Sequence, residues 1–181
     1  MPDVDIIEGT TAGAIDRVTE LHAVYYQREW GFGRYFETKV ATELAAFLER
    51  FDKRRDGFWT AVAGGRIEGA IAIDGSQAAT EGAHLRWFVV SDALRGQGVG
   101  GRLMGAAMAF CHSRHYDHVY LWTFEGLDAA RHLYEQHGFT LVEQRTGSTW
   151  GPEVLEQRME LRNAAGLDPD NVLTTHRADG T

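Results

Sequence analysis

The stretch from residue 96 to residue 101 contains the residue types most suited to binding a charged ligand. Four of these six positions are glycine, and Arg95 stands directly before them. A strand-like apolar run, residues 83–90, precedes the turn, and a helix-like sequence follows it. Glycines allow close backbone approach to a ligand, and a helix N-terminus offers free N–H groups and partial positive charge. The stretch therefore predicts a phosphate-binding loop.

Several kinds of phosphate-binding turn contain glycines at such spacing. Gly96, Gly98 and Gly101 satisfy G-x-G-x-x-G, and Glu125 stands near the position of a ribose-binding acid, as in a dinucleotide-binding fold. Against that alternative, residues 91–95 separate the strand from the first glycine, and no repeated βαβ units precede it. A P-loop is excluded because no Gly-Lys-Ser/Thr follows. Glycines that served only tight packing would still cost conformational entropy on folding, with no bound anion to offset that cost.

Two motifs point to one family. The segment Arg95-Gly96-Gln97-Gly98-Val99-Gly100 resembles the R/Q-x-x-G-x-G/A motif of the GNAT acetyltransferase superfamily. The segment DAARHLYEQHGF, residues 128–139, resembles the part of that family in which a helical tyrosine precedes a Gly-Phe turn. The runs LRWFVV and LWTFEGLDAARHLYEQHGF further resemble the acetyltransferase half of MarR–GNAT fusion proteins. Under that kinship, this chain corresponds to the catalytic part standing alone.

The resemblance implies acetyl-coenzyme A as cosubstrate, with its pyrophosphate on the backbone of the 95–100 loop. It also implies that a bulged strand splays from its neighbour and binds the pantetheine arm through the backbone of Phe88, Val89 and Val90. An N–H near Phe88 or Val89 would face the thioester carbonyl oxygen. Ala130 and Tyr134 complete the implied coenzyme site.

Acetyl transfer to an amine needs a neutral amine, a stabilised oxyanion and a proton for the leaving thiolate. Tyr134 matches the family tyrosine near the coenzyme sulfur, and the alternative is a packed ring whose hydroxyl bonds a backbone carbonyl. Water can serve as the base, and the candidate side chains, each also consistent with a surface charge, are Glu29, Glu81, His84 and Glu125. The candidate walls of the acceptor pocket are Tyr26, Trp30, Trp87 and Trp122, of which the last two also fit a buried sheet face.

Two further features, the segment 125–128 and the residues around Cys111, add no site. Many GNAT enzymes have an asparagine where this chain has Glu125-Gly126-Leu127-Asp128, so no role is transferred to that position. Cys111 and His115 have the i, i+4 spacing of a metal pair, with His112 and His118 nearby. Because Cys111 lies on an apolar stripe and histidines suit a helix C-terminus, we predict no metal.

The elements that must position these residues follow from hydrophobic periodicity. Helical spacing predicts helices over residues 11–30, 38–51, 99–114 and 128–137, the last capped by Asp128. Alternating or apolar runs predict strands over residues 4–8, 58–63, 66–73, 83–90, 118–124, 139–144 and 154–161. This order predicts an α+β fold with a mixed central β-sheet flanked by helices, and the resemblance makes it the GNAT fold. Residues 1–162 are expected to form one domain, followed by a polar tail over residues 163–181.

Composition narrows the class of partner. The 181 residues are 44% hydrophobic and 24% charged, as in an ordinary globular domain, and the net charge is −8. Such a charge disfavours nucleic acid and favours a cationic substrate, which Glu29, Glu81 and Glu125 could attract. No apolar run reaches the roughly 20 residues that span a bilayer, no signal-peptide pattern opens the chain, and one cysteine precludes an internal disulfide. We therefore predict a cytoplasmic protein without a membrane partner, and leave a homodimer open.

Together these observations predict an acetyl-CoA-dependent N-acetyltransferase. Its acceptor would be a primary amine of a small molecule, protein or peptide, attacking directly in a ternary complex. A non-catalytic acyl-CoA-binding sensor and a dinucleotide-binding oxidoreductase are the alternatives. Tyr134 favours the enzyme, because a sensor needs no acid at that position.

Overall fold

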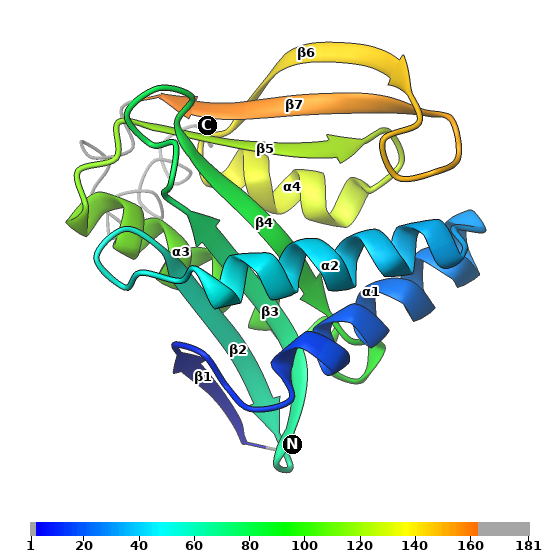
Figure 1. Cartoon of the computed structure of the whole chain (residues 1–181), viewed down its shortest axis with the longest axis horizontal. Coiled ribbons are helices and arrows are strands. Elements are labelled where there is room, and N and C mark those ends of the chain that lie inside the picture. Colours follow the sequence, from blue (N-terminus) through cyan, green and yellow to red (C-terminus); the bar gives the residue numbers. More distant parts are fainter. Residues whose placement is uncertain (1–2, 163–181) are drawn as a thin grey trace, which may run out of the picture.

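A computed structural model of the chain describes residues 3–162, and the predicted tail at 163–181 lies outside them. Helices and strands follow one another along the chain in the predicted order (Figure 1). They are β1 (Val4–Glu8), α1 (Ala14–Trp30), α2 (Arg34–Glu49), β2 (Gly57–Ala63), β3 (Arg66–Asp74), β4 (Ala83–Val90), the 3₁₀ turn η1 (Asp92–Leu94), α3 (Val99–Ser113), β5 (His118–Phe124), α4 (Asp128–Gln136), β6 (Thr140–Gly147) and β7 (Val154–Arg162). The predicted α+β architecture is confirmed.

The strands form one mixed sheet in the order β1-β2-β3-β4-β5-β7-β6. Within the described part of the chain, β4 and β5 are the single parallel pair, and every other neighbouring pair is antiparallel. A dinucleotide-binding fold requires a doubly wound parallel sheet. The oxidoreductase alternative is therefore wrong at the level of topology.

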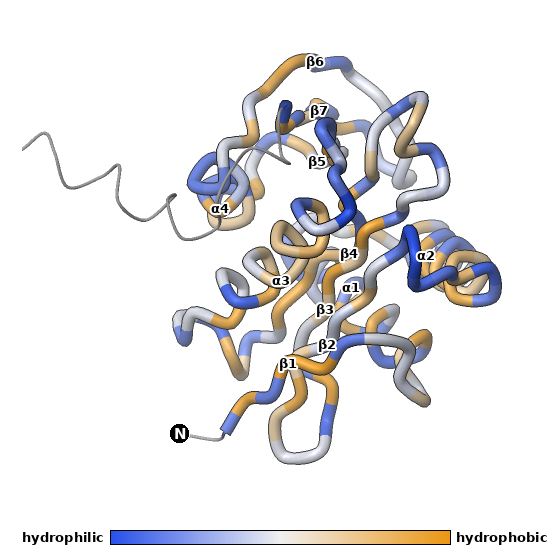
Figure 2. The backbone as a smooth tube through the Cα atoms, turned by 90° about the vertical axis from the view of Figure 1, so that its left-hand side faces the viewer, coloured by the Kyte–Doolittle hydropathy of each residue, from blue (hydrophilic) through white to orange (hydrophobic). Residues whose placement is uncertain are grey.

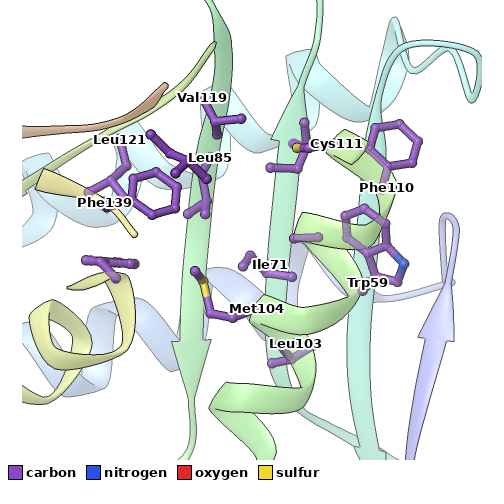
Figure 3. Close-up of a cluster of buried hydrophobic side chains, with 14 of the residues drawn as sticks. Trp59, Ile71, Leu85, Leu103, Met104, Phe110, Cys111, Val119, Leu121 and Phe139 are labelled. Atoms are coloured by element: carbon purple, nitrogen blue, oxygen red, sulfur yellow. The ribbon is translucent and has the colours of Figure 1, made fainter. Parts of the chain in front are cut away.

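Both faces of the sheet are covered. Figure 2 shows the apolar strands β2, β3 and β4 between α3 on one side and α1 and α2 on the other. The core under α3 joins side chains such as Trp59, Leu103 and Met104 (Figure 3). The core under α1 and α2 includes Leu44 and Phe47. Burial on both faces explains why β3 is apolar almost throughout instead of alternating.

The parallel pair is short and β4 is bulged, and these two features create the site. Register between β4 and β5 extends over two positions, Ala83 opposite Val119 and His84 opposite Tyr120. Further along, the strands separate (Figure 1). Between its pairings at Arg86 and Val89, β4 places two residues against the single residue Ile71 of β3. This two-against-one pairing defines a β-bulge, and the first of the two residues, Trp87, has a positive φ of 48°.

The structure corrects several predicted boundaries. The first helix begins at Ala14, not at residue 11, because Gly13 has a left-handed φ of 76°. The second begins at Arg34, not at residue 38, because Phe36 packs on Tyr26 and extends the first turn. Asp128 is the first helical residue of α4, not its cap, and the N-cap Leu127 has no side chain able to bond. The start of α2 therefore depends on packing between the helices, which the local pattern does not report.

Candidate active site

A groove opens where β4 and β5 separate, and we call it the loop groove. Its walls come from the 95–101 loop, the end of β4, α1 and the start of α4. The predicted coenzyme residues that line it are Phe88, Val89, Val90, Arg95, Gly96, Gly98, Val99, Gly100 and Ala130. Gly126 and Leu133 are also lining residues, and the sequence did not single them out for this purpose. Residues from four elements thus meet around the glycine-rich turn.

The glycine turn presents backbone donors to this groove. Gly96 and Gly98 both have φ of 74°, a left-handed conformation that turns successive N–H groups inward. The first hydrogen bond of α3 runs from the Arg102 N–H to the Gly98 carbonyl at 3.1 Å. Within residues 3–162, the N–H groups of Val99, Gly100 and Gly101 consequently have no acceptor. Free donors at a helix N-terminus suit a pyrophosphate.

The two long side chains of the motif behave differently. Arg95 lines the loop groove, where it stacks 4.5 Å over the Tyr25 ring and pairs with Asp92 at 2.9 Å. Gln97 is absent from the lining, because its side-chain amide donates to the Ala93 carbonyl at 2.9 Å. A guanidinium fixed by an aromatic ring keeps donors for a phosphate oxygen. Gln97 instead contributes by bracing the turn.

Among the strands of residues 3–162, none pairs with the β5-facing edge of β4 beyond His84. Phe88, Val89 and Val90 border the loop groove along this edge. An extended ligand can add to such an edge as another strand does, by bonding its backbone groups. The free edge therefore connects the glycine turn with the interior of the sheet.

A second hollow, the side-chain pocket, begins where the loop groove ends. It has a volume of about 310 Å³. Four residues line both spaces, namely Tyr26, Phe88, Leu127 and Ala130. Trp87 and Trp122 line the side-chain pocket, as predicted for an acceptor pocket. Two separately walled spaces thus share one junction at the bulge of β4.

Tyr134 lies next to this junction, and it does not line the loop groove, where the resemblance placed it. It is buried, lines the side-chain pocket, and has its ring 6.0 Å from that of Phe88. Among the described residues, none accepts a hydrogen bond from its hydroxyl, contrary to the alternative of a bond to a backbone carbonyl. Burial raises the pKa of Tyr134, and the nearby Tyr26 raises it further, so its proton is retained. The hydroxyl is therefore available to donate to a ligand.

Of the four candidate bases, only His84 lines the side-chain pocket. Its ring is stacked 4.4 Å from that of Tyr120. Burial lowers the pKa of His84 to about 3, and the positive charge of Arg86 acts in the same direction. The imidazole is consequently neutral at physiological pH and only weakly basic.

The remaining predicted residues lie elsewhere. Glu29, Glu81 and Glu125 are exposed and line neither space, because their carboxylates stay hydrated at a helix end and on loops. Glu29 bonds Arg28 at 2.7 Å. Trp30 does not line the side-chain pocket. Its ring instead packs on Phe124, with ring centroids 4.9 Å apart. The acidic cleft mouth expected from the sequence is thus not assembled by these carboxylates.

Sequence reasoning missed the charged residues that do line the side-chain pocket. They are Lys39, Glu43, Arg86, Arg145 and Glu156, from α2, β4, β6 and β7. Each stands in an amphipathic or alternating run, where a charged residue ordinarily marks the solvent side. A signal was present in VLEQRMEL, because Glu156 interrupts a strand that is buried at that position. Its neighbourhood could not be read from the sequence.

The Cys111 cluster does not resemble a metal site in three dimensions. Cys111 is buried in the core under α3, and burial raises the pKa of its thiol to about 12. Because α3 ends at Ser113 and His115 has a positive φ of 57°, His115 does not share the helix with Cys111. Within residues 3–162, no three His, Cys, Asp or Glu residues are grouped to hold a metal ion. Nor does that part of the chain contain a helix long and apolar enough to cross a membrane.

Comparison with known proteins relates this arrangement to one family. The model of the acetyltransferase (GNAT) family matches residues 15–139. An N-acetylaspartate synthetase from Xenopus tropicalis is 29% identical over 120 residues, which are 65% of this chain and 43% of that protein. The chain therefore spans less than half the length of this curated relative.

Solved structures share the fold at low identity. A GNAT-family acetyltransferase from Staphylococcus aureus has a TM-score of 0.69 and 18% identity, covering 88% of this chain and 99% of its own. The structure of yncA from Salmonella typhimurium with its cofactor acetyl-CoA has a TM-score of 0.70 and 16% identity, covering 88% and 94%. The family model spans the glycine turn, the bulged strand and the junction tyrosine, and on that ground the chain belongs to the acetyltransferase (GNAT) family.

Proposed function

We propose that this protein transfers the acetyl group of acetyl-CoA to a primary amine by direct attack in a ternary complex. The observation that carries the proposal is the junction of the loop groove with the side-chain pocket. An acyl donor lying along the free edge of β4 would bring its thioester to Phe88, and an amine in the side-chain pocket would meet it there. Neither reactant would have to leave before the other binds.

The residues present fit an acyl-CoA. The free N–H groups of Val99, Gly100 and Gly101, with the Arg95 guanidinium, suit its pyrophosphate. The β5-facing edge of β4 suits the amides of its pantetheine arm. A β4 N–H near the bulge would stabilise the oxygen of the reacting carbonyl, for which one donor contributes roughly 3 kcal/mol.

The chemistry is a balanced acyl transfer. The lone pair of the amine nitrogen attacks the thioester carbon, the carbon–sulfur bond breaks, and an amide and a thiol result. Tyr134 would give its proton to the departing sulfur. Its raised pKa does not forbid this, because the same burial destabilises a thiolate and so raises the affinity of the sulfur for a proton.

The amine must also lose a proton, and His84 is a weak base. We therefore propose that the amine reacts from its neutral fraction and that water removes the proton. The value of kcat/KM should then climb with pH until the free amine is deprotonated, without a step assignable to His84. The N-acetylaspartate synthetase relative supports an amine as the acceptor class. The kinship with MarR–GNAT fusion proteins and the cytoplasmic location stay predictions.

Binding and turnover together test this function. Calorimetry with acetyl-CoA, CoA and NAD(P) should show micromolar binding of the first two, about −8 kcal/mol, and none of the dinucleotide. Addition of primary amines should release free thiol and yield N-acetyl products by mass spectrometry. Binding without thiol release would instead indicate the non-catalytic sensor. Failure to bind acetyl-CoA would overturn the assignment altogether.

A further inference from the structure

The side-chain pocket differs in charge from the rest of the molecule. Its ionisable walls are three cations, Lys39, Arg86 and Arg145, and two carboxylates, Glu43 and Glu156. The imidazoles of His22 and His84 add no charge at neutral pH, since burial lowers their pKa values to about 4 and about 3. These walls thus carry an excess of one positive charge in a chain whose net charge is −8.

Both carboxylates of this pocket are already bonded to protein. Glu43 accepts from Lys39 Nζ at 2.7 Å and from the Arg86 guanidinium at 2.6 Å. Glu156, which is 1% exposed, accepts from Arg145 Nε at 3.0 Å and from the Thr149 N–H at 2.8 Å. Their capacity to attract a ligand's ammonium is correspondingly reduced.

The two arginines keep unused donors. A guanidinium has five N–H groups, and Arg86 and Arg145 each donate from one nitrogen to a carboxylate. Arg86 stacks 4.2 Å over Trp87, and Arg145 stacks 4.4 Å over Trp122. These two arginines come from β4 and β6, and both rings line the pocket. Stacking holds each planar group in place, which lowers the entropy lost when it binds an anion.

We infer that the acceptor is a small amine that also carries a carboxylate, as an amino acid does, and that Arg86 and Arg145 bind this carboxylate. The inference rests on the proposed function and specifies its substrate class. A guanidinium matches the two oxygens of a carboxylate in bidentate geometry. A polyamine would instead bring a second cation among three cations, which is repulsive at short range.

The first test uses the unaltered protein. Thiol release is measured with L-aspartate, L-glutamate and L-alanine, and with L-alaninamide, L-alanine methyl ester and putrescine. Because amides and esters have less basic amines, kcat/KM is divided by the neutral fraction of each amine. The carboxylate-bearing amines should exceed their matched derivatives by about 10-fold or more, which corresponds to about 1.4 kcal/mol per tenfold. Their KM should also rise with salt, since the attraction is screened over about 8 Å at physiological ionic strength.

The second test removes the cations. Arg86→Gln and Arg145→Gln should each raise KM for the preferred amino acid about 10-fold, leave kcat nearly unchanged, and leave KM for its amide unchanged. Arg145→Gln leaves the buried Glu156 carboxylate without its cation, which could itself disturb the pocket. The double variant Arg145→Gln/Glu156→Gln removes both charges, so the loss of the guanidinium is measured without an unpaired buried carboxylate. Arg66→Gln removes the same charge from the exposed start of β3 and is the control.

The outcomes separate the two levels of the proposal. Equal or better turnover of the carboxylate-free amines, after correction for neutral fraction, would overturn this inference and leave amine acetylation intact. Arginine variants that affect the acid and its amide alike would overturn it as well. Thiol release with none of the six amines would overturn the proposed function, and this inference with it.

Discussion

The loop groove and the side-chain pocket meet at one split in the sheet, yet they are built from different parts of the chain. The loop groove relies on backbone N–H groups of one short stretch and on a free strand edge. The side-chain pocket relies on charged and aromatic side chains from α1, α2, β4, β5, α4, β6, β7 and the turn between the last two. Backbone recognition requires a particular local conformation, whereas side-chain recognition requires distant segments to converge.

This contrast gives the bulge of β4 a double role. The extra residue ends regular pairing with β3 for one position, and Trp87 takes a left-handed φ. Phe88 then borders both spaces, and Trp87 lines only the side-chain pocket. One irregular backbone step therefore supplies a wall to the loop groove and another to the side-chain pocket.

The largest effect is expected from a side chain placed in the glycine turn, the backbone cradle formed by residues 96–101. Gly98→Glu should abolish acetyl-CoA binding, a loss of at least about 100-fold, because it brings negative charge to the pyrophosphate position and strains a φ of 74°. Beyond its chain neighbours, an added Cβ at Gly98 meets no atom within 4 Å, so no clash with another segment contributes to the loss.

Gly105→Glu is the matched control for that loss. Gly105 lies within α3, the helix that Gly98 precedes, has open space around an added Cβ, and does not line the loop groove. Calorimetry should show that this variant binds acetyl-CoA as the unaltered protein does. Equal losses of acetyl-CoA affinity in both variants would mean that binding depends on the overall charge near α3 and not on the glycine turn.

Next to the junction of the two spaces, Tyr134→Phe should lower kcat about 10- to 1,000-fold while coenzyme affinity barely changes. Because no described residue accepts from the Tyr134 hydroxyl, thermal stability should stay the same. Tyr116→Phe gives the reverse signature, since it loses a 2.8 Å bond to the Arg55 carbonyl far from the junction. That control should lose about 1 kcal/mol of stability and retain kcat. A folded Tyr134→Phe with normal turnover would leave Tyr134 as a packing residue.

A buried histidine in the wall of the side-chain pocket makes stability depend on pH. His22 is buried in this wall, with Nδ1 2.8 Å from the Val18 carbonyl, and burial lowers its pKa from 6.5 to about 4. Between these values the unfolded chain takes up a proton that the folded chain does not, so the free energy of unfolding falls as pH falls. The full effect is about 3 kcal/mol, present above pH 6.5 and lost toward pH 4.

Urea unfolding of the His22→Phe variant measures this contribution. Phenylalanine keeps an aromatic ring beside Tyr26 and removes the titrating group. Between pH 7 and pH 4.5, the variant should lose about 2 kcal/mol less stability than the unaltered protein. The same loss in both proteins would assign the acid sensitivity to other groups.

The smallest expected effect is a gain in stability from a substitution within α3, away from the loop groove. Gly105→Ala should raise stability by about 0.5–1 kcal/mol through helix propensity, because the added methyl group meets no atom within 4 Å. Acetyl-CoA affinity should be unchanged in calorimetry. A loss of affinity would show that the cradle depends on flexibility along α3.

Most of the fold could be predicted from periodicity and glycine placement. The runs at residues 83–90 and 118–124 match β4 and β5 at both ends. The short pairing of these strands and the bulge at Trp87 could be expected only from the family resemblance, since LRWFVV reads as an unbroken strand. Register and splay depend on contacts between segments and not on local preference.

The sequence by itself determined the order of elements and the glycine turn before α3, because each is encoded by neighbouring residues, whereas Tyr134 was singled out by the family resemblance. Only the tertiary structure decided which charges face the side-chain pocket. Glu29, Glu81 and Glu125 are acidic residues near the expected cleft, yet they stay in solvent, whereas the arginines of β4 and β6 lie against it. In a strand of alternating polarity, a charged residue predicts the solvent-facing side. Only the folded sheet shows that the side carrying Arg86 and Arg145 borders a pocket.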